Sequence, residues 1–239
     1  MRDDVLWLIT ARSGSKSIPN KNIKHLGGVP LLSYPIKAAL STLKDLSGEV
    51  WLLTDSKLYA NIGEKSGAMV PFIRPVQLAS DSASSIDVVL HAMQHASGLG
   101  KKFEYIGLLE PTSPFLSENH FYKALEKLKK SSSSSIVAVR EHRPNTIFVQ
   151  DQADTLLEIH KNLKRITDSG RQNFTAQITP SGGLYISKWD DFLKTETFYN
   201  EDTLPFMVSD THGLEIDEPL DWEWAEFLLK KKIIELEKT

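Results

Sequence analysis

The segment from Ala11 to Asn22 carries the residues in this sequence that are best suited to chemistry. It holds three cations, Arg12, Lys16 and Lys21, among small residues that leave backbone amides accessible. A nucleoside triphosphate carries about four negative charges, and guanidinium, ammonium and backbone N–H groups can bind them together. The spacing matches neither a P-loop nor G-x-G-x-x-G, so side chains must supply much of the neutralising charge. A solvated surface loop is the alternative interpretation.

A second candidate segment begins at Arg74, which adds a cation after an apolar stretch. The small residues Ala83, Ser84 and Ser85 follow a few positions later, at the start of an expected helix. Their hydroxyl and backbone groups could contact a nucleotide. The two serines fit an ordinary helix cap equally well.

A third segment follows an expected strand and contains Glu110, Thr112 and Ser113. Pro111 and Pro114 restrict the backbone there, which suits a binding loop, although a rigid turn without function looks the same.

The fourth segment places two carboxylates, Glu215 and Asp217, two residues apart before the last expected helix. In an extended stretch such residues project to the same side. Oxygen ligands on one side can hold Mg²⁺, which keeps several of its waters. Alternatively, Asp217 or Glu218 only caps the helix.

Composition excludes several other classes of protein. The chain of 239 residues has no cysteine, which excludes thiol catalysis, Cys–zinc sites and disulfide frameworks. Its 28 Lys+Arg against 31 Asp+Glu give a net charge of -3, so the basic excess of a nucleic-acid-binding domain is missing. No apolar run is long enough for a membrane span, and the expected location is the cytoplasm. His91 and His95 lie one helical turn apart but lack the glutamate of an HExxH zinc site.

Short apolar runs alternate with longer amphipathic stretches along the first half of the chain. The runs expected as strands are Leu6 to Thr10, Val50 to Leu53, Ala68 to Ile73, Tyr105 to Leu109 and Gly182 to Ser187. The expected helices are Pro30 to Leu43, Ser56 to Lys65, Ser85 to about Ala96, Ser117 to about Lys129, and Leu220 to about Glu237. This alternation predicts an α/β fold: a doubly wound, mostly parallel sheet with helices on both faces. Ligands of such sheets bind beyond the carboxyl ends of the strands, so the binding segments are expected after Thr10, Thr54 and Leu109.

The pattern changes after Ser131, where a five-serine run, interpreted as a loop, leads into a polar stretch. Residues 141–180 show few helical periods, and β-like pieces such as Thr146 to Val149 suggest hairpins. We expect an insertion there that packs against something else, while residues 1–140 and 181–239 form the main domain.

Taken together, these segments resemble the acylneuraminate cytidylyltransferases, the CMP-N-acetylneuraminic acid synthetase family. The pattern Ala-Arg-x-Gly-Ser-Lys-x-Ile-Pro-x-Lys-Asn, present from Ala11 to Asn22, is highly specific for that family. Further matching segments are Thr54 to Ser56, Pro71 to Pro75, Ser82 to Ser85, Pro111 to Pro114, and Glu215 to Asp217 with Asp221, Ala225 and Glu226. The resemblance covers most of the chain in the right order.

The resemblance implies a reaction in which CTP and a 2-keto-3-deoxy nonulosonic acid give the CMP-sugar and pyrophosphate, with Mg²⁺ as cofactor. It implies a nucleotide-diphospho-sugar transferase-like fold with a small dimerisation insertion, and therefore a homodimer, with neither nucleic acid nor membrane as partner. The catalytic residues it implies are Arg12, Lys21 and Asp217, with Asp217 and Glu215 as metal ligands. Those implied for nucleotide binding are Ala11, Arg12, Ser15, Lys16, Lys21, Asn22, Arg74, Ala83, Ser84 and Ser85. Those implied for the sugar are Glu110, Thr112, Ser113, Tyr185, Arg165 and Arg171. Lys21 is expected to be an exposed loop cation whose removal leaves the fold intact.

The sequence departs from the family pattern near the reacting groups. Glu110 stands where the family usually has Gln, Glu215 replaces the first Asp of the usual Asp-x-Asp, and Ser181 replaces a frequent Asn. Phe115-Leu116 replaces the common Leu-Arg and removes a cation. These changes favour a different nine-carbon sugar or an altered metal geometry. The alternatives are a CMP-Kdo-type synthetase and a non-catalytic relative that binds CTP.

Overall fold

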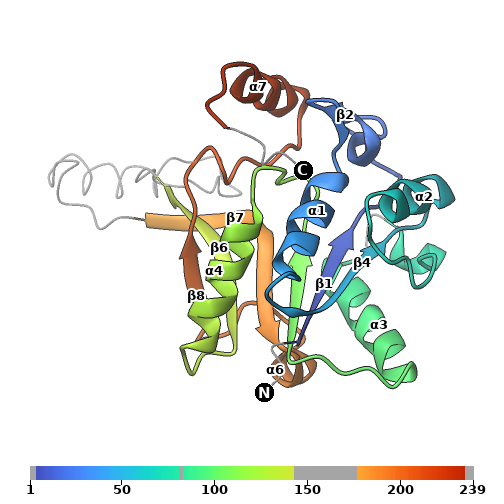
Figure 1. Ribbon diagram of the computed structural model, residues 1–239, viewed down its shortest axis with the longest axis vertical. Helices are drawn as coiled ribbons and strands as arrows, with labels where there is room; N and C mark the ends of the chain where they lie inside the picture. Colours follow the sequence, from blue (N-terminus) through green and yellow to red (C-terminus); the bar gives the residue numbers. More distant parts are fainter. Residues whose placement is uncertain (1–3, 81–82, 143–176, 235–239) are drawn as a thin grey trace, which may run out of the picture.

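The computed structural model describes residues 4–80, 83–142 and 177–234, and within them a six-stranded sheet dominates (Figure 1). The strand order is β4-β1-β5-β7-β6-β8. The strands are β1 (Asp4–Thr10), β4 (Ser47–Leu53), β5 (Tyr105–Leu109), β6 (Ser135–His142), β7 (Gln177–Lys188) and β8 (Leu204–Met207). β7 is antiparallel to both of its neighbours, whereas the other strands of this sheet share one direction.

Helices cover both faces of the sheet. Helices α1 (Ser33–Thr42), α2 (Lys57–Lys65) and α4 (Glu118–Lys129) pack on one face, and α3 (Ser85–Gly98) and α6 (Trp189–Thr195) on the other. The central strand β1 is therefore apolar on both sides, and Val5 to Ile9 are fully buried. Trp7 fills the first face, packing 5.5 Å from the Phe121 ring, and its indole N–H donates to Thr42 Oγ1 at 3.0 Å.

The predicted doubly wound, mostly parallel α/β fold is confirmed. Strand β5 and helix α4 have the predicted bounds, and α2 begins directly after Ser56, whose side chain caps it. These elements followed from strong local signals: short buried runs, and serine caps before amphipathic stretches.

The first helix begins later than predicted. Pro30 does not open it but lies in β3 (Val29–Pro30), which pairs with β2 (His25–Leu26). Gly27 and Gly28 between them have φ of 56° and 88°, the left-handed region that a two-residue hairpin turn requires. This turn decided the local structure, and α1 starts only at Ser33.

The predicted strand from Ala68 to Ile73 is only two isolated bridges, in which Met69 pairs with Trp51 and Ile73 with Thr54. Pro71 lies between them and has no N–H to donate, which interrupts the hydrogen-bond ladder.

The last helix, α7 (Pro219–Lys230), ends well before Glu237. Lys232 has a φ of 54°, and its N–H bonds to the Leu229 carbonyl, as is typical of a helix end. Helix α6, strand β8 and the reversed direction of β7 were not predicted from the sequence, because they depend on pairing between distant segments.

The expected insertion at 141–180 falls mostly outside the described residues, and so does the piece from Thr146 to Val149. Its two ends are in the sheet, because Glu141 and His142 of β6 pair with Ile178 and Gln177 of β7. The inserted unit itself stays a prediction.

Candidate functional site

A cavity of about 440 Å³ opens at the carboxyl ends of β1 and β5. Twelve of the residues singled out in the sequence line it, from four separate segments: Arg12, Ser15, Lys16, Lys21, Asn22, Arg74, Ala83, Ser84, Ser85, Glu110, Thr112 and Asp217. Its volume lies in the range of sites for small molecules and cofactors. The structure thus brings together groups that are up to about two hundred residues apart in the sequence.

Asp55 anchors the loop that follows β1 by two hydrogen bonds. The Asp55 carboxylate accepts hydrogen bonds from the Ser13 N–H at 2.8 Å and the Ser13 hydroxyl at 2.7 Å. Asn22 holds the other end, because its side-chain amide donates to the Arg12 carbonyl at 3.0 Å. These contacts turn the loop back over the strand end, so that its cations face the cavity. Asp55 belongs to the motif Thr54 to Ser56, but its role in holding this loop was not predicted from the sequence.

Lys21 lies in a different environment from the exposed one expected for it. Its side chain is only 10% exposed, and Nζ donates to the Ile216 carbonyl at 2.7 Å and to Asp217 Oδ1 at 3.0 Å. Two segments at opposite ends of the chain are joined through this one ammonium group. Lys21 therefore supports the structure of the site as well as its charge.

Arg74 lines the cavity from a separate segment of the chain. Its backbone N–H donates to the Thr54 carbonyl at 2.9 Å, and its guanidinium donates to the Leu78 carbonyl. Burial lowers the pKa of Arg74, an effect that Asp55 opposes and Arg12 reinforces. Its Nε is buried and has no hydrogen-bond partner among the described residues. A buried donor of this kind is costly without an acceptor, so it points to an anionic or carbonyl group of a ligand.

The structure agrees with both interpretations of the pair Ser84 and Ser85, a helix cap and a place in the binding cavity. Ser84 caps α3, its hydroxyl accepting from the Asp87 N–H at 3.1 Å while Asp87 accepts from the Ser84 N–H at 3.1 Å. Both serines nevertheless line the cavity. The N-terminal end of α3, where the helix dipole is positive, consequently faces the same space as the cations.

The far end of the cavity is acidic. Glu110 follows β5, and its carboxylate accepts a hydrogen bond from the Gly183 N–H at 3.1 Å. Burial raises the pKa of Glu110 and Asp217 raises it further, while the hydrogen bonds from Gly183 and Tyr185 and the charge of Lys21 lower it. Glu110 is therefore fixed by its neighbours. It lies between the cations of the cavity and the side chains of Glu215 and Tyr185.

Glu215 lies behind the cavity and does not line it. Burial raises its pKa to about 7, and Glu110 and Asp217 add to the effect, while Arg140 and Lys21 oppose it. A Cβ at Gly182 would come within 2.3 Å of Glu215 Oε1, so only glycine leaves room for this carboxyl group. The φ of 64° at Gly182 is also one that glycine adopts without strain.

Tyr185, a residue of β7, lies beside Glu110. Burial and the charge of Glu110 raise the pKa of Tyr185. Tyr199, from the segment after α6, packs edge-on against it with the ring centroids 6.2 Å apart. Tyr199, and Arg140 near Glu215, were not predicted as part of the site. Neither belongs to a sequence motif or lies at a fixed spacing from one.

Three other predicted residues lie near the cavity without lining it. Ala11 is fully buried beneath the loop, Tyr185 lies behind Glu110, and Ser113 is 3% exposed with no hydrogen-bond partner for its hydroxyl among the described residues. Arg165 and Arg171 lie outside the described residues.

The fit of a magnesium ion differs between the two predicted ligands. Asp217 is 65% exposed on its side chain and lines the cavity, so one of its oxygens can bind a cation while the other contacts Lys21. Glu215 is half-buried, does not line the cavity, and has its pKa raised to about 7, chiefly by burial. Within the described ranges there is no group of three His, Cys, Asp or Glu that could hold a metal ion. Magnesium often uses one or two carboxylates together with substrate phosphates, an arrangement that Asp217 fits.

The fold and the site define a class of protein: an α/β protein with a cationic cavity for a phosphorylated ligand at the carboxyl ends of its strands. No helix in the described ranges is long and apolar enough to cross a membrane. Residues 6–203 match the cytidylyltransferase family. The chain belongs to this family.

Several characterised relatives align with nearly the whole chain. It is 31% identical over 235 residues to an N-acylneuraminate cytidylyltransferase of Escherichia coli, covering 97% of this chain and 54% of that protein. It is 30% identical to a CMP-N,N'-diacetyllegionaminic acid synthase of Legionella pneumophila, covering 95% of this chain and 96% of the relative. A pseudaminic acid cytidylyltransferase of Campylobacter jejuni is 28% identical over 94% of this chain and 96% of its own. The chain thus spans about half of the first relative and nearly all of the other two.

Solved structures support the fold. CMP:2-keto-3-deoxy-manno-octonic acid synthetase in complex with CTP superposes with a TM-score of 0.68 at 14% identity, covering 96% of this chain and 99% of that one. A 4-diphosphocytidyl-2C-methyl-D-erythritol synthase from Anaerococcus prevotii gives 0.59 at 14% identity, covering 95% and 98%. At this level of identity they show a shared architecture.

Proposed function

We propose that this protein transfers CMP from CTP to the anomeric hydroxyl of a sialic-acid-like nonulosonic acid and releases pyrophosphate. The observation that carries the proposal is the cavity itself. Three cations from two separate segments line a space of about 440 Å³: Arg12 and Lys16 from one, and Arg74 from the other. The carboxyl group of Glu110 also lines this space. In a member of the cytidylyltransferase family, this arrangement suits a triphosphate at one end and a sugar acid at the other.

The chain's own residues would act by positioning and by neutralising charge. Nucleotidyl transfer depends chiefly on alignment of the attacking oxygen and on stabilising charge on the phosphates. Arg12 and Lys16 would bind the phosphate oxygens, and Arg74 would place its unpaired Nε–H against the nucleotide. Lys21 would hold Asp217 in place at the edge of the cavity, close to where the pyrophosphate leaves.

Magnesium would be held by Asp217 together with phosphate oxygens. When bound, it supplies positive charge to the phosphates and to the departing pyrophosphate. Glu215 fits this role less well, because its carboxyl group is half-buried against Gly182 and does not line the cavity.

The sugar would lie beyond Glu110 and Thr112, towards Tyr185. The names of the relatives favour a nonulosonic acid, because those with about 30% identity act on acylneuraminic and legionaminic acids. The Kdo-type alternative rests on a structural neighbour of 14% identity, which supports the fold alone. Homodimer formation and a cytoplasmic location stay predictions.

Pyrophosphate release tests the proposal directly. The protein is incubated with CTP, Mg²⁺ and one sugar acid at a time: N-acetylneuraminate, its non-acetylated C9 analogue, legionaminate, pseudaminate or Kdo. We expect release with a nine-carbon acid and much less with ATP, GTP or UTP in place of CTP.

Each contrary result excludes a different part of the proposal. Release only with Kdo would establish the eight-carbon alternative. Tight CTP binding by calorimetry without release from any sugar acid would favour the non-catalytic interpretation, and absence of CTP binding would exclude the nucleotide site altogether.

A further inference from the structure

The segment between α6 and β8, residues 196–203, carries two aromatic side chains that contact Tyr185. The Phe198 ring centroid lies 5.6 Å from that of Tyr185, and the Tyr199 centroid 6.2 Å from it. Phe198 is buried in the core, whereas Tyr199 is 50% exposed. Tyr185 in turn lies close enough to Glu110, at the end of the cavity, for its phenol to lower the pKa of that carboxyl group. The conformation of this segment therefore bears on the sugar side of the proposed site.

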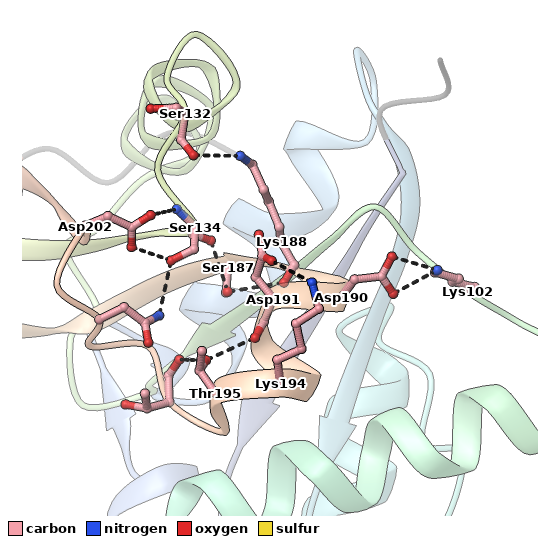
Figure 2. A network of polar contacts seen from close by, with 12 residues as sticks. Lys102, Ser132, Ser134, Ser187, Lys188, Asp190, Asp191, Lys194, Thr195 and Asp202 are labelled. Carbon is pink, nitrogen blue, oxygen red and sulfur yellow. Dashed lines mark hydrogen bonds and ion pairs between the residues drawn. The ribbon is translucent and has the colours of Figure 1, made fainter.

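The five-serine run, residues 131–135, holds the segment by hydrogen bonds (Figure 2). The Asp202 carboxylate accepts from the Ser134 N–H at 2.7 Å and from the Ser134 hydroxyl at 2.6 Å. The side-chain amide of Asn200 donates to the same hydroxyl at 3.2 Å. We refer to these contacts between Ser134, Asp202 and Asn200 as the serine clamp.

The serine clamp is also joined to the strand that carries Tyr185. The Ser134 carbonyl accepts from the Lys188 N–H at 2.9 Å and from the Ser187 hydroxyl at 3.1 Å, both in β7. One residue of the serine run thus fixes β7 and the segment 196–203 relative to each other. Its two partners are the elements that bring Tyr185 and Tyr199 together.

We propose that Ser134 and Asp202 are positioning residues for the sugar half of the site. They fix the backbone at residues 199–202, so that Tyr199 packs against Tyr185 and keeps the Tyr185 ring beside the Glu110 carboxyl group. Neither residue touches the cavity; they act through the aromatic pair. The inference rests on the proposed function for its link to the sugar acid, while the clamp itself is independent of it.

The competing explanation is that burial of Phe198 alone holds the segment. Phe198 packs 4.6 Å from Phe192 in the core and would anchor the chain at one point. Thr203 Oγ1 adds hydrogen bonds within the segment, with the Asn200 N–H at 2.6 Å and the Phe198 carbonyl at 3.2 Å, but these two bonds do not join the segment to β7. The bidentate carboxylate contact with Ser134 supplies that connection, because charge-assisted bonds to both a backbone and a side-chain donor restrict direction as well as distance.

The test compares three substitutions by steady-state kinetics with CTP and the active sugar acid. Asp202→Ala removes the clamp, while Asp202→Asn keeps it, because an amide oxygen can accept from the Ser134 N–H and its NH₂ can donate to the hydroxyl. The matched control is Asp190→Ala, which removes an equally exposed carboxylate that pairs with Lys102 at 2.8 Å at the same end of the molecule (Figure 2).

For Asp202→Ala we expect the KM of the sugar acid to rise about five- to tenfold, as for the loss of hydrogen bonds that order a binding element. The KM of CTP should stay within about twofold, because the cationic half of the cavity is built from other segments. Asp202→Asn should restore most of the wild-type KM, and Asp190→Ala should match the wild type. An unchanged sugar KM in Asp202→Ala, or an equal rise for sugar and CTP, would overturn the inference.

Hydrogen–deuterium exchange separates failure of this inference from failure of the proposed function. Asp202→Ala should exchange faster in the peptides covering 196–203 and Tyr185, while Asp190→Ala should not. If the wild-type protein releases no pyrophosphate with any sugar acid, the proposed function fails, and the exchange result still decides the clamp. Unaltered exchange in both peptides would show that the segment is held without the serine clamp.

Discussion

At the scale of single residues, the site separates carboxyl groups by their exposure to solvent. Burial raises the pKa of Glu110 and of Glu215, and the nearby charge of Asp217 raises both further. Asp217 is the exposed one and lies beside the Lys21 ammonium. A hard divalent cation needs a charged oxygen with access to water and phosphate, so Asp217 is the member of the three that fits this task.

Asp217→Asn tests this assignment. The amide oxygen of Asn can still accept from Lys21, so the fold should be kept, while the loss of charge weakens binding of a hard cation. We expect the Mg²⁺ concentration for half-maximal activity to rise at least about tenfold. Titration of the initial rate with Mg²⁺ at saturating CTP measures this. A variant with the wild-type Mg²⁺ requirement would remove Asp217 from the metal site.

At the scale of elements, caps and turns decide where the functional side chains are presented. Serine caps begin α2, α3 and α4, and the glycine pair at Gly182 and Gly183 lets β7 pass close to Glu215 and Ser113. At the start of α4, the His120 ring nitrogen Nδ1 accepts from the Ser117 N–H at 3.1 Å. The imidazole takes the part that a Glu or Gln plays in a capping box.

His120 therefore makes stability depend on pH. Burial, the nearby His212 and then Lys123 lower its pKa from 6.5 to about 4. The folded protein then binds fewer protons than the unfolded chain between those values, so the free energy of unfolding should fall as the pH drops from about 6.5 to about 4. Discounted for partial exposure, the loss is about 1–2 kcal/mol.

Comparison with His120→Gln isolates this contribution. Glutamine keeps an acceptor for the Ser117 N–H but does not titrate. Glu215 has the opposite sign, because its raised pKa makes stability fall as the pH rises from 4.5 to about 7, and this contribution is present in both proteins. Urea unfolding at pH 4, 5, 6 and 7 should show a wild-type minus variant difference that becomes more negative towards pH 4. A difference independent of pH would exclude His120 as the titrating group.

At the scale of the whole molecule, the cavity exists because the two ends of the main domain meet. Lys21 joins the loop after β1 to Ile216 and Asp217, and Ser17 adds a hydrogen bond to the Asp217 carbonyl. Helix α7 and the β2–β3 hairpin lie together at the end of the sheet where β1 ends (Figure 1). Their contact is apolar: Leu26 and Trp222 belong to one buried cluster.

Lys21→Met should lower stability as well as activity. The substitution keeps the aliphatic stem but leaves the Ile216 carbonyl without its donor, which costs about 1–3 kcal/mol for a buried acceptor. Lys16→Met is the matched control, since Lys16 is exposed on the same loop and lines the same cavity. It should weaken CTP use while changing the free energy of unfolding by less than about 0.5 kcal/mol. Equal stabilities of the two variants would show that the buried bonds of Lys21 do not stabilise the fold.

The sequence by itself determined the alternation of strands and helices, and hence the α/β fold. Those features are local: a buried strand shows as a short apolar run, and a helix shows as a cap followed by a period of 3.6 residues. It also placed most of the cavity's residues, because a parallel sheet gathers the segments after its strands at one edge. Arg12 and Lys16 were identifiable in this way from their types and their position after the first strand, whereas Arg74 was noted only as a cation after an apolar stretch.

Only the tertiary structure decided which of these residues are buried, paired or exposed. The burial of Lys21, the half-buried state of Glu215 and the support of Tyr185 by Tyr199 depend on contacts between segments distant in the sequence. The reversed direction of β7 and the pairing of β8 with β6 have the same origin, since strand pairing is a long-range choice that local propensity does not encode. The residue types that suit the site's chemistry could be identified from the sequence, but the electrostatics of the site depend on packing in the folded structure.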